Sequence, residues 1–351
     1  MASGAKSAGR PSAGTLHLTP EEEAAIDTIP YDGLPLPDWR ELRDVTVLRS
    51  GICMRHWRIL PDSVHQYPHL RARFAKIAYG SRLSRRLTRL PDTGRYVVAH
   101  NLWAGGYYHW ITEALPRIMA LDPWPADAIL LLPRNVGIRC AMAESARLLG
   151  VAVVETFPPG RNVRAPRLIL PRNPDRQLEI APATLAALRA RLLDAAGLRA
   201  DVAPHRRIYV SRARARARRI TNEDEIAAHL ARHGFERVFM EDLDLRAQMA
   251  LMLEAEAVVG LHGAGLTNIA FMQPGARVLE IFRHAPGRAN WAPVRRTTRL
   301  HPAFARLAWA GGQHYFALLA EAADAGQSFD EGDVTVDTRA LEAKLAAMER
   351  V

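Results

Sequence analysis

A histidine and a glutamate one helical turn apart form the first candidate catalytic group. His109 and Glu113 follow a Gly-Gly pair that interrupts the preceding strand pattern. A spacing of four places His109, Glu113 and Arg117 on one face of a predicted helix. An imidazole or a carboxylate there can accept a proton from a sugar hydroxyl. The competing interpretation is an aromatic-rich core helix on which Glu113 is simply solvated.

An arginine-rich segment follows a second predicted strand. Ser211 and Arg212 come directly after that strand, at the edge where wound parallel sheets bind ligands. Arginine suits bidentate contact with phosphate. Arg212 and one of Arg218 and Arg219 are therefore the candidates for an anionic ligand, while the remaining arginines are expected to form a solvated loop.

A glycine-rich turn between two apolar strands is the third candidate. Small residues at 260–268 let backbone approach a ligand, and the N–H groups of a helix start favour an anion. Glu280 ends the next strand, where a carboxylate can bind ribose hydroxyls or pair with an arginine. The candidate phosphate and sugar contacts are His262, Gly263, Ala264, Gly265 and Asn268, although a structural role is the commoner one for a lone histidine.

No metal or other cofactor is expected. Asp242 and Asp244 match an Asp-X-Asp pattern that holds a metal-nucleotide in some transferases, but Asp244 is explained as a helix N-cap. The thirteen histidines show no spacing typical of metal ligands.

Alternating strands and helices are predicted to position these groups in two α/β domains. The pattern predicts a disordered tail over 1–20, a first domain over 21–175, a second over 176–325, and a terminal strand and helix over 326–351 that could pack back on the first domain. The residues from Arg71 to Leu90 are basic without clear alternation. Thr221 and Asp244 are predicted to cap helices.

Composition agrees with a two-domain α/β protein. The chain has 351 residues, 48% of them hydrophobic, and a formal charge of +10 that favours acidic partners such as phosphorylated ligands, anionic lipid or nucleic acid. No apolar run is long enough for a transmembrane helix. Cys53 and Cys140 are expected to be reduced and buried.

Three motifs in register resemble glycosyltransferase family 61 over roughly residues 95–285. They are Tyr108-His109-Trp110 with Glu113 and Leu115-Pro116; Tyr209-Val210-Ser211-Arg212 with Arg219 and Asn222-Glu223; and Gly260 to Asn268 with Phe271, Pro274-Gly275 and Glu280-Ile281.

The resemblance implies a GT-B fold, with two Rossmann-like domains facing across a cleft. It also implies inverting, metal-independent transfer from a nucleotide-sugar. Glu113 would then be the base, assisted or replaced by His109. The donor would be held by Arg212, Arg219, Ser211, His262, Gly263, Ala264, Gly265, Asn268 and Glu280.

The chain departs from the family's eukaryotic members because it shows no signal anchor and no set of disulfide cysteines. We therefore expect a bacterial cytoplasmic enzyme, peripheral at the inner membrane through its basic surface. The expected acceptor is a glycan or lipid-linked glycan of a capsule, lipopolysaccharide or similar polymer.

Two other functions compete with this prediction. The arginines from Arg206 to Arg219 could bind nucleic acid, but only Tyr209 supplies an interleaved aromatic ring. The chain could also be an inactive relative that serves as an assembly partner. This alternative is disfavoured because the chain has Glu113, His109 and Arg212.

Overall fold

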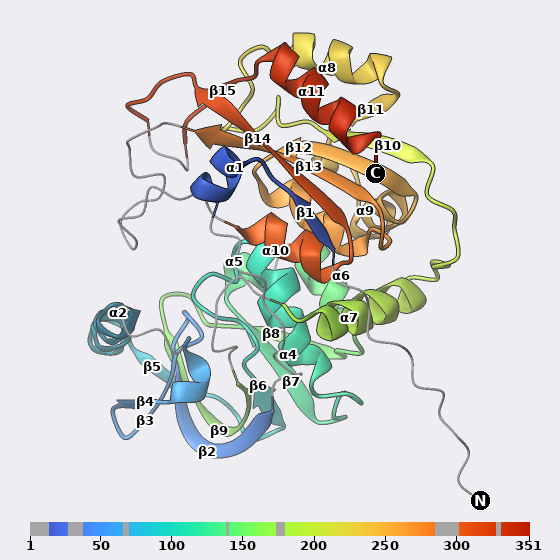
Figure 1. The fold of residues 1–351 in the computed structure, drawn as a ribbon. Coiled ribbons are helices and arrows are strands. Elements are labelled where there is room, and N and C mark those ends of the chain that lie inside the picture. The colour runs from blue at the N-terminus through green and yellow to red at the C-terminus, as the bar shows by residue number, and fades with distance from the viewer. Residues whose placement is uncertain are drawn as a thin grey trace, which may run out of the picture.

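The computed structural model describes residues 14–26, 38–65, 70–137, 140–172, 180–284, 302–327 and 331–351. The chain forms two β-sheets, each flanked by helices, that lie one above the other in Figure 1. The predicted α/β class is therefore confirmed.

The first sheet is mixed rather than parallel. Its strands lie in the order β4-β3-β2-β9-β6-β7-β8, and β5 also pairs with β9. β6, β7, β8 and β9 are parallel, whereas the long strand β2 runs antiparallel to β9. The bounds are β2 Trp39–Val47, β3 Cys53–Arg55, β4 Arg58–Ile59, β5 Leu87–Arg89, β6 Arg95–Val97, β7 Ala128–Leu132, β8 Val153–Thr156 and β9 Asn162–Pro171.

The second sheet is parallel apart from one short edge strand, β15. Its order is β1-β14-β13-β12-β10-β11. Numbered along the chain from β10, the five strands from β11 to β14 lie in the order 2-1-3-4-5, so the winding reverses between β10 and β12. The bounds are β1 Thr15–His17, β10 Arg206–Val210, β11 Phe235–Val238, β12 Ala255–Leu261, β13 Arg277–His284, β14 His314–Ala322 and β15 Val334–Thr335.

Helices cover both faces of the second sheet, because its strands alternate apolar side chains between the two faces. Tyr209 packs with α8 and α11 on one face, while Ile208 and Val210 pack with α9, η5 and α10 on the other. The helices are α1 Pro20–Ala25, α2 Arg71–Ser84, α3 Tyr107–His109, α4 Leu115–Met119, α5 Arg134–Gly137, α6 Cys140–Leu148, α7 Pro182–Ala195, α8 Glu223–Arg232, α9 Leu245–Leu253, α10 Ala303–Ala310 and α11 Thr338–Met348. Short 3₁₀ segments are η1 Pro61–Ser63, η4 Met240–Asp242 and η5 Ala264–Phe271.

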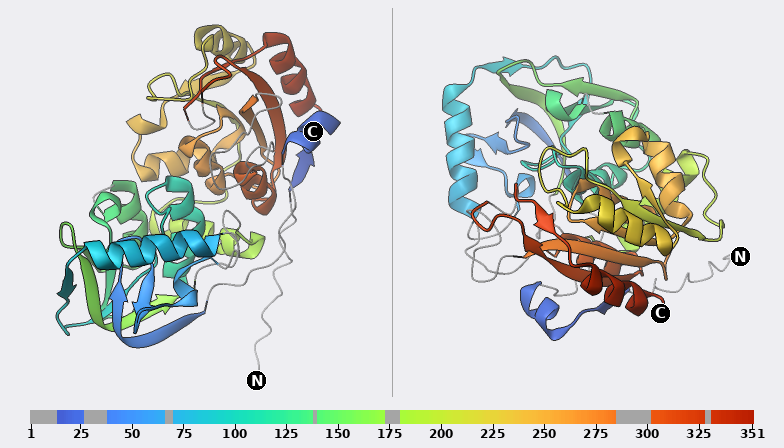
Figure 2. Two further views of the ribbon diagram at one scale, coloured as in Figure 1. Left: turned by 90° about the vertical axis from the view of Figure 1, so that its left-hand side faces the viewer. Right: turned by 90° about the horizontal axis from the view of Figure 1, so that it is seen from above.

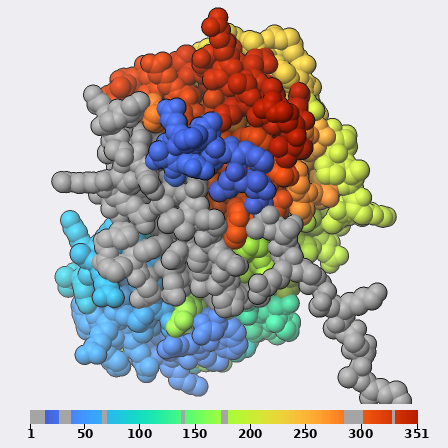
Figure 3. Space-filling model, viewed as in Figure 1, coloured from blue at the N-terminus to red at the C-terminus, as the bar shows by residue number. Residues whose placement is uncertain are grey.

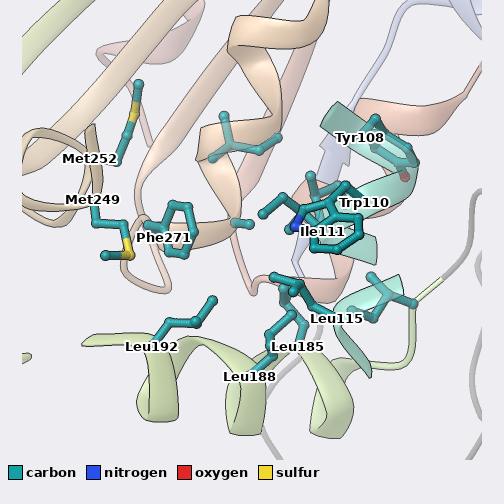
Figure 4. Close-up of a cluster of buried hydrophobic side chains, with 14 of the residues drawn as sticks. Tyr108, Trp110, Ile111, Leu115, Leu185, Leu188, Leu192, Met249, Met252 and Phe271 are labelled. Atoms are coloured by element: carbon teal, nitrogen blue, oxygen red, sulfur yellow. The ribbon is translucent and has the colours of Figure 1, made fainter. Parts of the chain in front are cut away.

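One continuous apolar core joins the two sheets. The helical segment that starts at Tyr107 brings its apolar side chains against α7, α9 and η5. Figure 4 labels the side chains that meet there: Tyr108, Trp110, Ile111, Leu115, Leu185, Leu188, Leu192, Met249, Met252 and Phe271. Because these side chains are buried on both sides of the boundary, they hold the groups carried by the two sheets in a fixed relation.

Both ends of the chain differ from the prediction. Thr15–His17 adds a strand beside β14, and Thr19 caps α1 in a capping box, so residues 14–20 are not a disordered tail. Figure 3 shows this segment in dark blue against the C-terminal elements in red. α11 buries Leu341 and Leu345 against the second sheet, so it does not pack back on the first domain. The predicted boundary at 175 lies outside the described residues.

Smaller expectations had mixed outcomes. Asp244 caps α9 by accepting a hydrogen bond from the N–H of Ala247 at 2.7 Å, as predicted. Thr221 caps no helix; its hydroxyl donates instead to the carbonyl of Val334. Cys53 is free and buried, while the side chain of Cys140 lies outside the described part of the chain.

Candidate functional site

His109 and Glu113 form a hydrogen-bonded pair at the start of the helical segment after β6. Nδ1 of His109 lies 2.9 Å from Oε1 of Glu113. The imidazole is 17% exposed, whereas the glutamate side chain is 0% exposed. The histidine is therefore the member of the pair that an external molecule can reach.

Two further side chains hold the second carboxylate oxygen of Glu113. The side-chain amide of Asn101 donates to Oε2 at 2.5 Å, and Nε2 of His65 lies 3.6 Å from it. Both groups are buried. His109, Asn101 and His65 thus hold both oxygens of the buried Glu113 carboxylate.

The charge of Glu113 follows from these neighbours. Burial raises the pKa of Glu113, but the charges and hydrogen bonds of His109 and His65 outweigh burial and hold that pKa well below its ordinary value. An ionised carboxylate can only accept hydrogen bonds, so Nδ1 of His109 must donate. Nε2 of His109 is then the nitrogen that can take up a proton.

A π-helical turn places the pair. Residues Trp110–Ala114 form the π turn (η3) between α3 and α4, immediately before Pro116. Proline lacks an N–H and crowds the carbonyl four residues earlier, and a wider turn relieves both effects. The hydroxyl of Thr112 donates to the carbonyl of Tyr108 at 2.8 Å and so satisfies one backbone group there.

Arg117 was predicted on the same helical face as His109 and Glu113, but its role is structural. Its guanidinium is fully buried and donates to the carbonyls of Pro171, Ala99 and Val98. These carbonyls lie at the ends of β9 and β6. Arg117 therefore ties the ends of the two strands together, close to the loop that carries Asn101.

A second histidine and glutamate face this pair from the other sheet. Nδ1 of His262, at the end of β12, is hydrogen-bonded to Oε1 of Glu280, and the hydroxyl of Tyr315 donates to Oε2 at 2.6 Å. Burial raises the pKa of Glu280 well above its ordinary value. Glu280 has no exposed surface, so it can act on a ligand only through His262.

Aromatic rings connect the two pairs across the boundary. The ring of Phe304 lies 5.1 Å from that of His262 and 5.4 Å from that of Tyr108. Tyr108 in turn lies 6.0 Å from His109 between ring centres. The hydroxyl of Tyr107 donates to Oδ1 of Asn268 at 2.9 Å, which ties α3 to η5. Asn268 thus links the two halves.

Arg212 and Gly263 meet where the winding of the second sheet reverses, at the carboxyl ends of β10 and β12. Arg212 donates through Nε to the carbonyl of Arg218 and through Nη2 to that of Ala217, both at 2.9 Å. A Cβ atom at position 263 would lie 2.3 Å from Nη1 of Arg212, so only glycine leaves room for this guanidinium. Burial, aided by the charge of Arg218, lowers the pKa of Arg212 to about 10, and the side chain stays cationic at neutral pH.

The other predicted donor residues have different surroundings. Ser211 is buried and donates to Glu223, and Arg219 forms an ion pair with Asp333 at 3.1 Å. Ala264 is exposed beside Gly263. A Cβ at Gly265 would come within 3.0 Å of Val210, so Gly265 serves close packing of η5 on the sheet.

Comparison with known proteins identifies the family. Residues 107–279 match the sequence model described as Glycosyltransferase 61. The chain belongs to glycosyltransferase family 61. The matched range begins two residues before His109 and ends one residue before Glu280, so it includes most of the site.

A distant relative supports the same family. The chain is 35% identical over 77 residues to the EGF domain-specific O-linked N-acetylglucosamine transferase of Drosophila melanogaster. This alignment covers 21% of the chain and 15% of that protein's length. Family membership thus places the chain among the glycosyltransferases. The activity in the relative's name is a statement about that protein only.

Sequence reasoning missed three side chains that hold the glutamates of this family 61 site, namely His65, Asn101 and Tyr315. His65 approaches Glu113 from a loop, and Tyr315 binds Glu280 from the start of β14. None belongs to a motif, so no sequence pattern pointed to them. Asn101 lies four residues before the Gly-Gly pair, so it is the missed side chain nearest to a motif.

Within the seven described ranges, no group of three or more His, Cys, Asp or Glu side chains is arranged to hold a metal ion. Among the helices there, none is both long and apolar enough to cross a bilayer.

Proposed function

We propose that this family 61 protein is an inverting glycosyltransferase of GT-B architecture. It would transfer a sugar from a nucleotide-sugar to a hydroxyl of a glycan acceptor without a metal ion. The observation that carries the proposal is that the rings of Phe304 and Tyr108 connect His262 of the second sheet to His109 of the first. An oriented histidine lies on one side, and the half-buried cation Arg212 beside a glycine-rich helix start lies on the other.

His109 is the base in this proposal, and Glu113 is its positioning residue. The acceptor hydroxyl would lose its proton to Nε2 of His109 while its oxygen attacks the anomeric carbon. Glu113 would stabilise the resulting imidazolium through Nδ1. This proposal replaces the prediction that Glu113 is the base. The Glu113 carboxylate is fully buried and both of its oxygens are hydrogen-bonded within the protein, so it cannot touch the acceptor.

The departing nucleoside diphosphate would be stabilised from the second sheet. As the bond between the anomeric carbon and the phosphate oxygen breaks, negative charge develops on the diphosphate. Arg212 and the first N–H groups of η5, at Ala264 and Gly265, would supply the positive charge. His262 would donate to the donor, held by Glu280. Arg219 is left out of this set because Asp333 already balances its charge.

The acceptor and location are proposed from the same reasoning. We propose a bacterial cytoplasmic enzyme at the inner face of the membrane, acting on a lipid-linked glycan of a capsule, lipopolysaccharide or similar surface polymer. Acceptor choice would depend on parts of the chain outside the matched range, such as α2.

A thermal-shift screen tests the donor half of the proposal. The full chain would be melted with a panel of nucleotide-sugars, each with and without EDTA. We expect stabilisation by one donor that survives EDTA, and NMR of the product should show inversion at the anomeric carbon. Stabilisation that EDTA abolishes would refute metal independence, and retention of configuration would refute inversion.

The nucleic-acid alternative loses support from the arrangement of the arginines. Arg206 pairs with Glu236, Arg207 with Glu256 and Arg214 with Asp242. The segment that looked like a basic cluster is therefore largely neutralised within the protein. The inactive-partner alternative would be favoured if no donor and acceptor pair gave turnover despite donor binding.

A further inference from the structure

α2 and the neighbouring β3–β4 hairpin form a basic surface on the first half of the molecule. The sequence from Ser63 to Leu90 contains no Asp or Glu. Figure 2 shows α2 on the outside of the molecule in both views. The exposed basic side chains of the helix, the hairpin and the turn after α2 are Arg55, Arg58, Arg71, Arg73, Lys76, Arg85 and Arg86. None of the seven forms an ion pair within the described ranges.

Large apolar side chains are exposed in the middle of this basic surface. Leu83 is 76% exposed, Trp57 51% and Tyr79 40%. The hydroxyl of Tyr79 donates to the carbonyl of Trp57 at 3.2 Å, so the helix and the hairpin present these side chains together. Only three other large apolar side chains of the described residues are exposed. Such a concentration marks an interaction surface.

A polar hollow lies beside Trp57. It has a volume of about 180 Å³ and is lined by Asp44, Thr46, Met54, His56, Trp57, Arg82 and Arg164. Arg164 is paired with Asp44, while the guanidinium of Arg82 lies over the ring of Trp57 at 4.7 Å. Arg82 and His56 give the hollow the polarity that suits a phosphate headgroup.

The same helix reaches the proposed acceptor base. Near its start, Phe74 and Arg73 contact the ring of Trp103, and Trp103 stacks on His109 at 6.1 Å. Ten residues separate Arg73 from Leu83, which corresponds to about 15 Å along a helix. One end of α2 thus contacts the ring that stacks on His109, and the other end carries the exposed Leu83.

We propose that Trp57, Tyr79 and Leu83 insert into the interface of an anionic bilayer, with the surrounding arginines and Lys76 against the lipid phosphates. Tryptophan and tyrosine favour the headgroup level of a membrane, and basic side chains add attraction to anionic lipid. An exposed leucine gains nothing from a nucleic acid or a soluble polyanion, so the apolar side chains favour the bilayer. The link to a lipid-linked acceptor rests on the proposed function.

Vesicle flotation of the full chain tests the docking without any transfer reaction. The probes are phosphatidylcholine vesicles with and without 30 mol% phosphatidylglycerol, in about 0.15 M salt. We expect binding only to the anionic vesicles. Leu83→Ser should reduce the partition coefficient at least about threefold, and Arg85→Glu/Arg86→Glu at least about tenfold.

Matched variants on other surfaces are the controls. Val153→Ser removes another exposed apolar side chain, and Arg339→Glu/Arg350→Glu makes the same charge change at the exposed side chains of the C-terminal end. Both should bind vesicles like the wild type. Equal losses in control and test variants, no binding to anionic vesicles, or a loss with the charge variant but not with Leu83→Ser would each overturn the proposal. The last outcome would indicate a general polyanion site, and competition by duplex DNA would identify it. Vesicle binding without nucleotide-sugar binding would refute the proposed function alone.

Discussion

Nδ1 of His109 lies 2.9 Å from Oε1 of Glu113, and only the histidine has exposed surface. This relationship assigns the two residues different roles. Glu113 fixes the orientation and the tautomer of the imidazole, and His109 meets the acceptor. Asn101 and His65 complete the arrangement by holding the other carboxylate oxygen.

Arg212→Met should weaken donor binding strongly. Loss of the half-buried cation beside Gly263 is expected to raise the donor dissociation constant by at least about tenfold, because charge-assisted phosphate contacts contribute about 1.5–3 kcal/mol. Isothermal titration with the donor, or with its nucleoside diphosphate, measures the change. An unchanged dissociation constant would exclude Arg212 from the donor site.

Gly263→Ala should also weaken donor binding, for a steric reason. The added methyl group would lie 2.3 Å from Nη1 of Arg212, so the guanidinium must move. Gly80→Ala is the matched control, since a Cβ there meets no atom within 4 Å. If both alanine variants bind the donor equally well, the close approach of Arg212 to Gly263 has no role in binding.

Arg117→Met should destabilise the fold rather than alter chemistry. The substitution leaves the carbonyls of Pro171, Ala99 and Val98 without their donor inside the core. We expect a loss of about 3 kcal/mol in the free energy of unfolding, measured by urea denaturation. Arg339→Met, at an exposed position, should stay within about 0.5 kcal/mol of the wild type. A loss below about 1 kcal/mol for Arg117→Met would contradict the structural role.

The stability of the protein should depend on Glu113 in a defined pH range. The pKa of Glu113 in the folded protein lies well below its ordinary value of 4.5. The unfolded chain therefore takes up the proton first as pH falls, and the contribution of the ionised carboxylate is lost below that value. Relative to Glu113→Gln, the wild type should therefore lose stability as pH falls from about 5 to about 3. Melting curves of both proteins test this, and a difference that grows as pH falls would show the opposite shift.

Local patterns were enough to predict the elements that carry the site. The strands before Arg212 and before the glycine-rich turn bury their apolar side chains, and buried apolar strands have a simple sequence signal. α2 was not predicted, because only Phe74 and Ala78 of its side chains are buried, while the apolar Tyr79 and Leu83 are exposed, so its sequence shows no clear apolar face. The mixed character of the first sheet depends on β2 pairing with β9, which lies more than a hundred residues away.

Residue types alone could not separate the roles of the charged side chains. Glu113, Arg117 and His109 share one helical face, but burial and the π turn give each a different partner. Arg212 and Arg219 are both candidates for phosphate binding in the sequence, but in the structure Asp333 pairs with Arg219. Such assignments depend on neighbours distant in sequence, so they require the structure.

The most direct test of the central claim is the transfer rate of His109→Ala under saturating donor and acceptor, with donor affinity measured in parallel. The account predicts a fall in turnover of about 10²–10⁴-fold with a donor dissociation constant within about twofold of the wild type, and partial rescue by added imidazole. Turnover within about threefold of the wild type would contradict the assignment of His109 as the base.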